Sequence, residues 1–229
     1  MAFAGLHAQG VSSPCLDEVR SIYQRLTAAS RGADAMYLEY TVTSAMRDSS
    51  LRPTTSHIVA VSNRTRLRVV SREMEVYSDE RNVFTVVPAR KEVYLADRIP
   101  GGDSERIAGV PLLRDGLLSR CSVISCGDVA GTADKSIVLH TTDTGPFAKT
   151  IAIVYNRDAA MIRSIGIRYD AGEIASIDMR FTRVNYHYAD TVPVGPVSTL
   201  VLNADGTFLP KYDGYRLIDV REKDYHGGR

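Results

Sequence analysis

The residues whose side chains could act in catalysis, such as histidine, serine, aspartate and glutamate, are scattered along this sequence and do not form a known catalytic motif. His57, His140 and His187 all lie in segments with strand-like patterns, where a histidine is usually structural or on the surface. The chain has no Gly-x-Ser-x-Gly turn, phosphate-binding loop, dinucleotide fingerprint or metalloprotease helix. Asp170 and Glu173 are close in sequence, but they flank a turn, which favours such residues. We therefore expect no enzymatic activity, no cofactor and no metal site.

The three cysteines offer a second kind of chemistry. Cys121 and Cys126 are five residues apart and Cys15 stands alone. A metal site would need more ligands, and no histidine is close to the pair. In an exported protein, a Cys121–Cys126 disulfide is the expected state, and two buried thiols on one strand are the alternative. Their odd separation places them on opposite faces of a regular strand, so the bond requires a bend or turn.

The length, the net charge and the distribution of apolar residues argue against some classes of function. The 229 residues suit one domain with a sizeable core. The net charge is +1, without a strong cluster of either sign, which argues against a nucleic-acid partner. No apolar run approaches the length of a membrane-spanning helix. We expect a soluble monomer without stable membrane insertion.

The first residues have the character of a processed leader. Residues 1–10 are small and apolar and have no basic start, as at the end of a signal peptide, with a plausible cleavage point near residues 6–9. An ordinary flexible N-terminus is the alternative. We therefore divide the chain into a leader remnant or flexible N-terminus at 1–12, one domain at 13–222, and a flexible polar tail at 223–229.

Residues 63–97 predict a β-meander around which the other elements are arranged. Arg64, Arg66 and Arg68 alternate with uncharged residues at the period of two typical of a half-buried strand. Polar turns then separate further β-rich runs at 83–87 and 93–95. Consecutive strands of this kind build a surface or a container.

The flanking segments predict a helix followed by many strands. A helix should begin near Pro14, capped by Ser12 or Ser13, and run to about Ser30 with one apolar face. The predicted strands cover residues 36–46, 54–62, 119–125, 136–142, 149–156, 161–169 and 174–188. The apolar segment 107–118 is interrupted by two glycines and a proline, which favours short helical turns over one long helix.

One stretch of the meander resembles a known family. The run Asp79-Glu-Arg-Asn-Val-Phe-Thr-Val-Val-Pro88, followed by Glu92-Val93, is similar to the signature of the LolA/LolB-like periplasmic lipoprotein carriers. Glu80 stands where that pattern has Gly, and Phe84 where it has Trp. The order of elements from about residue 16 to 221 is also similar. The resemblance implies a mainly β fold with α (α+β): a strongly curved antiparallel sheet, an unclosed barrel of about ten strands, with an N-terminal helix and a short helical lid at 107–118 on its concave side.

The resemblance also implies a function. Such a protein is a periplasmic carrier of lipoproteins or other lipidated, hydrophobic ligands, with an acyl chain in a concave apolar cavity. Carriers of this family hold the lid with an arginine, for which Arg64 is the positional match. The alternatives are that Arg64 faces water and that 107–118 is ordinary core. The residues expected to line the cavity are apolar: Met36, Leu38, Tyr40, Val42, Phe84, Val86, Leu112, Leu113, Leu117, Met179 and Phe181.

A second function class fits the same fold. The protein could be a non-catalytic interaction module that docks a protein partner in a cell-envelope complex. A hollow concave face favours the carrier, and a face filled by its own side chains favours the docking module.

Overall fold

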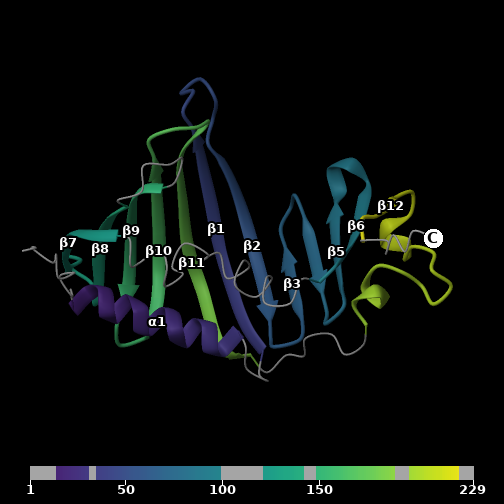
Figure 1. Cartoon of the computed structure of the whole chain (residues 1–229), viewed down its shortest axis with the longest axis horizontal. Helices are drawn as coiled ribbons and strands as arrows, with labels where there is room; N and C mark the ends of the chain where they lie inside the picture. The colour runs from purple at the N-terminus through teal and green to yellow at the C-terminus, as the bar shows by residue number, and fades with distance from the viewer. Residues whose placement is uncertain (1–13, 31–34, 99–120, 142–147, 189–195, 222–229) are drawn as a thin grey trace, which may run out of the picture.

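Strands dominate the computed structural model, which describes residues 14–30, 35–98, 121–141, 148–188 and 196–221. One α-helix lies against a large sheet in this part of the chain (Figure 1). The elements are α1 Pro14–Ser30, β1 Ala35–Met46, β2 Thr54–Ser62, β3 Leu67–Val70, β4 Glu75–Ser78, β5 Asn82–Val87, β6 Glu92–Asp97, β7 Cys121–Asp128, β8 Asp134–Thr141, β9 Ala148–Asn156, β10 Met161–Tyr169, β11 Ile174–Tyr188 and β12 Arg216–Asp219, with 3-10 turns η1 Pro88–Arg90, η3 Val197–Leu200 and η4 Pro210–Tyr212.

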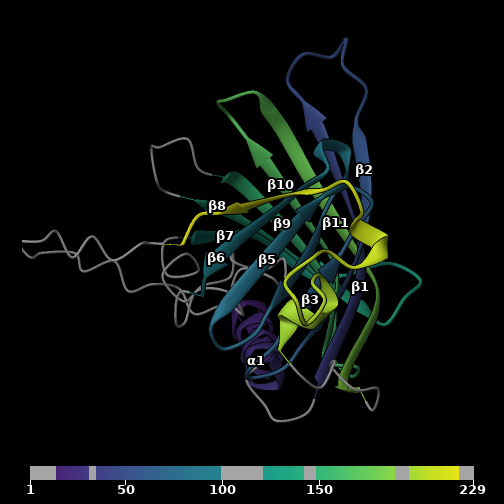
Figure 2. The ribbon, with the colours of Figure 1, turned by 90° about the vertical axis from the view of Figure 1, so that its right-hand side faces the viewer.

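The twelve strands form one sheet in the order β12-β6-β5-β4-β3-β2-β1-β11-β10-β9-β8-β7. Pairing is antiparallel except between β12 and β6, which run parallel. The long strands β1 and β11 join the two halves, and the curved sheet ends at β12 and β7 without closing (Figures 1 and 2). The predicted fold class is therefore confirmed, with twelve strands in the described residues in place of about ten.

Helix α1 has the bounds that its sequence predicts. Pro14 starts the helix and Asp17 lies in its first turn, where a carboxylate favours the positive end of the helix dipole. Cys15, Leu16, Val19 and Ile22 are buried and form one stripe at helical spacing. This stripe packs on the sheet, and we call the side of the sheet that it covers the helix face.

A continuous row of side chains crosses the helix face through six strands. Residues that lie directly opposite one another in neighbouring antiparallel strands point to the same side of the sheet. The successive partners from β1 to β6 are Leu38, Ala60, Val69, Val76, Thr85 and Tyr94. Because the row starts in the core under α1, all its members lie on the helix face.

The C-terminal segment covers the other side of the sheet. Tyr77 pairs with Arg68, which lies between the buried Leu67 and Val69 of the helix face, so Tyr77 points to the opposite face. There it forms a separate core with the segment 197–215, which contributes Val197, Val201 and Tyr212. The expected proline-containing turn before a final strand is present as η4 and β12.

The start of the meander differs from its prediction. Residues 63–66 form a turn, not the beginning of a strand, and β3 starts at Leu67. Asn63 explains the difference, because its Oδ1 accepts hydrogen bonds from the backbone N–H groups of Thr65 and Arg66 at 3.1 and 2.9 Å. The expected lid at 107–118, the leader at 1–12 and the tail at 223–229 lie outside the described residues.

Candidate binding site

Six of the predicted cavity residues come together on the helix face of β1 and β11. The pairing of these strands places Tyr40 opposite Phe181 and Val42 opposite Met179. The rings of Tyr40 and Phe181 are 5.2 Å apart. Met36 and Leu38 complete the group. All six belong to the larger core, and among the six only Val42 is partly buried. Sequence alternation therefore located this part of the apolar face correctly.

The space under α1 is filled by the protein itself. Leu38 is only 1% exposed, and the apolar stripe of α1 packs into the same cluster. Burying side chains such as Leu16, Val19 and Ile22 contributes about 1.5–3 kcal/mol each, so α1 is a substantial part of the core. This region is a packed core with α1 in place, and a ligand could enter it only if α1 moved.

Phe84 and Val86 correct the predicted site. Phe84 pairs with Tyr77, so both Phe84 and Val86 point to the opposite face, away from Met36 and Leu38. They are buried beneath Val197 and Val201 of the C-terminal segment. The two residues therefore cannot share a cavity with the β1 and β11 residues.

The residues that resemble the carrier signature hold the C-terminal segment in place. Asp79 Oδ2 accepts the backbone N–H of Val197 at 3.0 Å, and Glu92 Oε1 accepts a hydrogen bond from Arg216 Nη2 at 2.7 Å. Partial burial raises the pKa of Asp79, but hydrogen bonds from the backbone N–H groups of Arg81, Asn82 and Val197 leave it below its ordinary value. The motif is thus structural here.

The remaining predicted residues are only partly placed. Leu112, Leu113 and Leu117 lie outside the described residues. Arg64 is exposed in the β2–β3 turn. Its expected contact with the lid stays a prediction, because the lid segment is not described.

Beyond α1, the helix face continues as a half-buried apolar strip. In Figure 1 the helix lies beneath the half of the sheet that contains β7 to β11 and does not extend beneath β3 to β6. Along the row from β1 to β6, burial decreases from Leu38, through Val69 at 8% exposure, to half-buried Val76 and Tyr94. We call Val76, Val83, Val87, Tyr94 and Ala96 the apolar strip. The sequence-based prediction takes Phe84 and Val86 from the run 83–87 as cavity residues, whereas strand pairing places Val83 and Val87 on the helix face.

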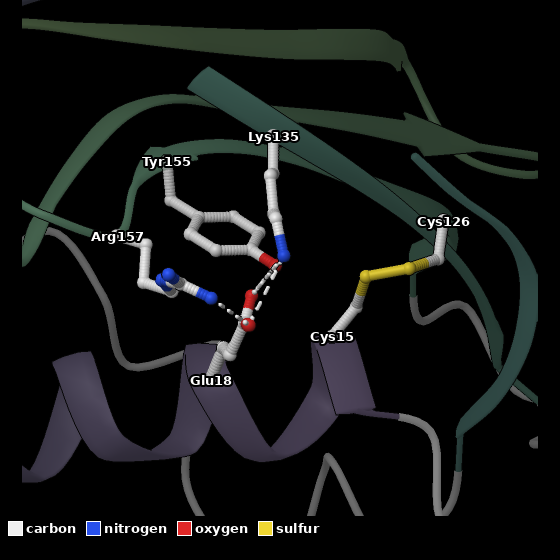
Figure 3. The surroundings of a disulfide bond; sticks show 6 residues. All are labelled: Cys15, Glu18, Cys126, Lys135, Tyr155 and Arg157. Carbon is white, nitrogen blue, oxygen red and sulfur yellow. Dashed lines mark hydrogen bonds and ion pairs between the residues drawn. A yellow bond between two sulfur atoms is a disulfide. The ribbon is translucent and has the colours of Figure 1, made fainter. Parts of the chain in front are cut away.

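Helix α1 is held at its N-terminal end by a charged cluster (Figure 3). Glu18 accepts hydrogen bonds from Tyr155 Oη at 2.7 Å and from Lys135 Nζ at 3.1 Å, and Arg157 Nη1 lies 3.6 Å away. The hydrogen bond from Tyr155 lowers the pKa of Glu18, burial opposes this, and Lys135 adds to the lowering. Burial and the Glu18 carboxylate raise the pKa of Tyr155. Sequence reasoning missed this cluster, which joins residues more than a hundred positions apart.

The disulfide corrects the predicted cysteine pairing. Cys126 is bonded to Cys15, 111 residues away, so the expected Cys121–Cys126 bond is wrong. A bulge between Val123 and Ser125 places Cys121 and Cys126 on the same face, opposite Thr141 and Ile137 respectively. Those partners are four residues apart, about 13 Å along a strand, whereas bridged Cα atoms lie within about 7 Å.

The polar groups of the opposite face do not assemble into a catalytic set. His57 Nε2 and Tyr37 Oη contact the two oxygens of Glu39 at 3.0 and 2.9 Å, which lowers the pKa of that carboxyl. The His57 side chain is about half exposed, and no nucleophile adjoins it among the described contacts. No group of three potential metal-ligating side chains occurs in the described parts of the chain. None of the described helices is long and apolar enough to cross a membrane.

Two surface pockets lie away from the apolar strip. One of about 340 Å³ lies on the opposite face of β1, β10 and β11, and its lining includes Thr41, Gly166 and Arg180. The other, of about 510 Å³, lies at the β2–β3 and β4–β5 turns and includes Arg66 and Arg81. The smaller pocket has a largely polar lining, and the larger one is bordered mainly by charged and polar residues, so neither offers a continuous apolar surface for an acyl chain.

Comparisons with known proteins give structural similarity only. No protein-family model and no curated protein matches the chain. Solved structures similar to it include an uncharacterized conserved protein from Thermus thermophilus (6% identity, TM-score 0.47, 87% of this chain and 98% of that one). A putative outer membrane lipoprotein-sorting protein domain from Vibrio parahaemolyticus matches at 9% identity, TM-score 0.36, and 77% and 95% coverage. The MucA/MucB complex of Pseudomonas aeruginosa matches at 16% identity, TM-score 0.36, and 84% and 63% coverage. A domain of the lipoprotein-sorting type suggested by the resemblance is among these structures.

Proposed function

We propose that this protein is a non-catalytic carrier that binds an acyl chain or another hydrophobic ligand on the apolar strip of β4 to β6. The observation that carries the proposal is the decrease in burial along one row of the helix face. Leu38 is sealed under α1, whereas Val76 and Tyr94 are half-buried although they lie in the same row. An apolar surface that continues past the helix covering it is suited to an apolar ligand.

The energetics favour a chain-like ligand on this surface. Burying one methylene contributes about 0.8 kcal/mol, so a chain of several methylenes gains enough to bind in a partly open groove. The strip runs across β4, β5 and β6, where Val76, Val83 and Tyr94 provide successive contacts. We place the protein in the periplasm, and the Cys15–Cys126 disulfide supports an oxidising compartment.

A fluorescent fatty-acid displacement assay, combined with native mass spectrometry, tests the proposal. Val76→Asp places a charge on the strip and should weaken probe binding at least tenfold. Val154→Asp is the matched control, because Val154 is also a half-buried strand valine but points to the opposite face. Unchanged binding by folded Val76→Asp protein, or equal loss in both variants, contradicts a site on the strip.

A second candidate function rests on the filled interior. Met36, Leu38 and Tyr40 are buried in the same core as the apolar stripe of α1 and do not line a hollow. A filled face suits a module that docks an envelope protein on its surface. If folded wild-type protein neither retains lipid nor binds the probe, the docking module becomes the better explanation.

A further inference from the structure

Covalent and ionic contacts to the sheet are concentrated at the N-terminal end of α1. The disulfide joins Cys15, in the first turn, to Cys126 on the edge strand β7. One turn later, Glu18 meets Tyr155 and Lys135 (Figure 3). Near the other end, the described polar contact is Arg25, whose guanidinium lies 5.0 Å from the ring centre of Tyr186. One covalent bond therefore secures the N-terminal end of α1 to the edge strand β7.

The two sulfur atoms of this bond are in different surroundings. Cys15 is 3% exposed, whereas Cys126 is an exposed residue at the sheet edge. An external thiolate therefore reaches the sulfur of Cys126 first. The leaving sulfur of Cys15 then lies in the first turn of a 17-residue helix, where the helix dipole favours its thiolate and the burial of Cys15 opposes it.

From this arrangement we propose that the Cys15–Cys126 disulfide is a reducible tether, opened by an external dithiol, whose reduction lets apolar ligands reach the helix face under α1. This inference rests on the proposed function, because it concerns access to the same face of the sheet. It adds a regulatory step, since the oxidised form would offer only the strip beyond α1. The reduced form would also offer the surface around Ile137, the strand partner of Cys126, and Ile153, which both lie in the core at the tethered end of α1.

The disulfide is reduced by two successive thiol–disulfide exchanges. One thiolate of the dithiol attacks Sγ of Cys126 and forms a mixed disulfide, and Cys15 leaves as a thiolate and takes up a proton. The second thiol of the reductant, as its thiolate, attacks the reductant sulfur of the mixed disulfide and releases Cys126, which is then protonated. The protein disulfide gains two electrons, and the dithiol is oxidised to a disulfide. Cys121 cannot replace Cys15, because it lies too far along β7 from Cys126.

Reduction of the disulfide removes one attachment of α1 to the sheet and leaves the other contacts of the helix in place. The apolar stripe of Leu16, Val19 and Ile22 and the Glu18 cluster remain. The sheet itself is joined by strand pairing that does not involve the disulfide. Reduction should therefore loosen α1 selectively and leave the central strands intact.

Hydrogen exchange measured by mass spectrometry tests the tether without any ligand. We expect residues 15–30 to exchange at least tenfold faster in reduced wild-type protein than in oxidised protein, with β9 to β11 unchanged. The double variant Cys15→Ser/Cys126→Ser should behave as the reduced form under oxidising conditions. Cys121→Ser is the control and should behave as wild type, because Cys121 is outside this disulfide. Equal exchange of α1 in the oxidised and reduced forms overturns the proposal.

Fluorescent fatty-acid binding tests the consequence for the ligand. The reduced protein should bind the probe at least threefold more tightly than the oxidised protein. Equal binding by both forms, with faster exchange of α1 on reduction, overturns the regulatory step but leaves the carrier function standing. If neither form binds the probe, the carrier function and the ligand step of the inference both fail, while the exchange data alone decide whether the disulfide restrains α1.

Trapping the mixed disulfide tests the direction of attack. Brief treatment of oxidised protein with a monothiol such as glutathione, followed by acid quenching and peptide mapping, should locate glutathione on Cys126. Glutathione found mainly on Cys15 would overturn the assignment of Cys126 as the attacked sulfur.

Discussion

Phe84 and Val83 are neighbours in β5 that point to opposite faces of the sheet, and their truncation should have different consequences. Phe84 is 2% exposed and packs under the C-terminal segment, whereas Val83 is half-buried on the apolar strip. Phe84→Ala should lower the free energy of unfolding by about 3–5 kcal/mol, the usual cost of truncating a buried phenylalanine. Because the total stability of a domain is about 5–15 kcal/mol, this is a large fraction of it.

The destabilisation caused by Phe84→Ala should be observed first in the C-terminal segment. Val197, Val201 and Tyr212 pack in the same core, so residues 197–215 should lose protection in hydrogen exchange before the central strands do. Fatty-acid binding by the folded variant should be unchanged. Val83→Ala should show the reverse, with about 1 kcal/mol of destabilisation but several-fold weaker binding.

Urea denaturation and the fatty-acid assay, applied to both variants, measure these effects. A lower urea midpoint with an unchanged slope reports the loss of stability. Two results together would refute the assignment of the two faces. One is weaker fatty-acid binding by Phe84→Ala while residues 197–215 keep full protection from hydrogen exchange. The other is unchanged binding by Val83→Ala.

Two further predictions concern the charged cluster of α1 and the opposite face. Because the pKa of Glu18 is lowered in the folded protein, its stabilising contribution is present above the unfolded-state pKa of about 4.3 and is lost as the pH falls through the folded-state pKa. Glu18→Gln should thus lower the free energy of unfolding by about 1.5–3 kcal/mol at pH 7 and by much less at pH 3. Urea denaturation at both pH values measures this difference. An equal loss of stability at the two pH values would contradict an ionised contact. A Cβ at Gly166 would lie 2.9 Å from Asp178 Oδ1, whereas one at Gly127 would meet no atom within 4 Å. Because that oxygen ends a half-exposed side chain paired with Arg168, Gly166→Ala should displace the pair and destabilise the protein by about 1 kcal/mol in thermal unfolding, and Gly127→Ala, as the control, should cost clearly less.

The local elements were determined by the sequence itself. The apolar spacing between Pro14 and Ser30 predicted α1, and alternation predicted β1, β2 and the hairpin of β10 and β11. These patterns arise from contacts between neighbouring residues, because a helix repeats every 3.6 residues and a strand every two. The grouping of Met36, Leu38 and Tyr40 on one face followed from the same alternation.

Tertiary structure decided everything that depends on how distant segments meet. Neighbouring residues of a strand, such as Val83 and Phe84, point to opposite faces, but only the register of β4 against β3 and β5 decides which of the two lies on the helix face. The partner of Cys126 was decided by the helix packing that brings Cys15 next to β7, across 111 residues. Spacing within β7 could not show this, because its bulge and length become visible only when β8 is paired with it. The C-terminal segment likewise packs on its side of the sheet through contacts with Phe84 and Tyr77, and no periodicity in the sequence indicates these contacts.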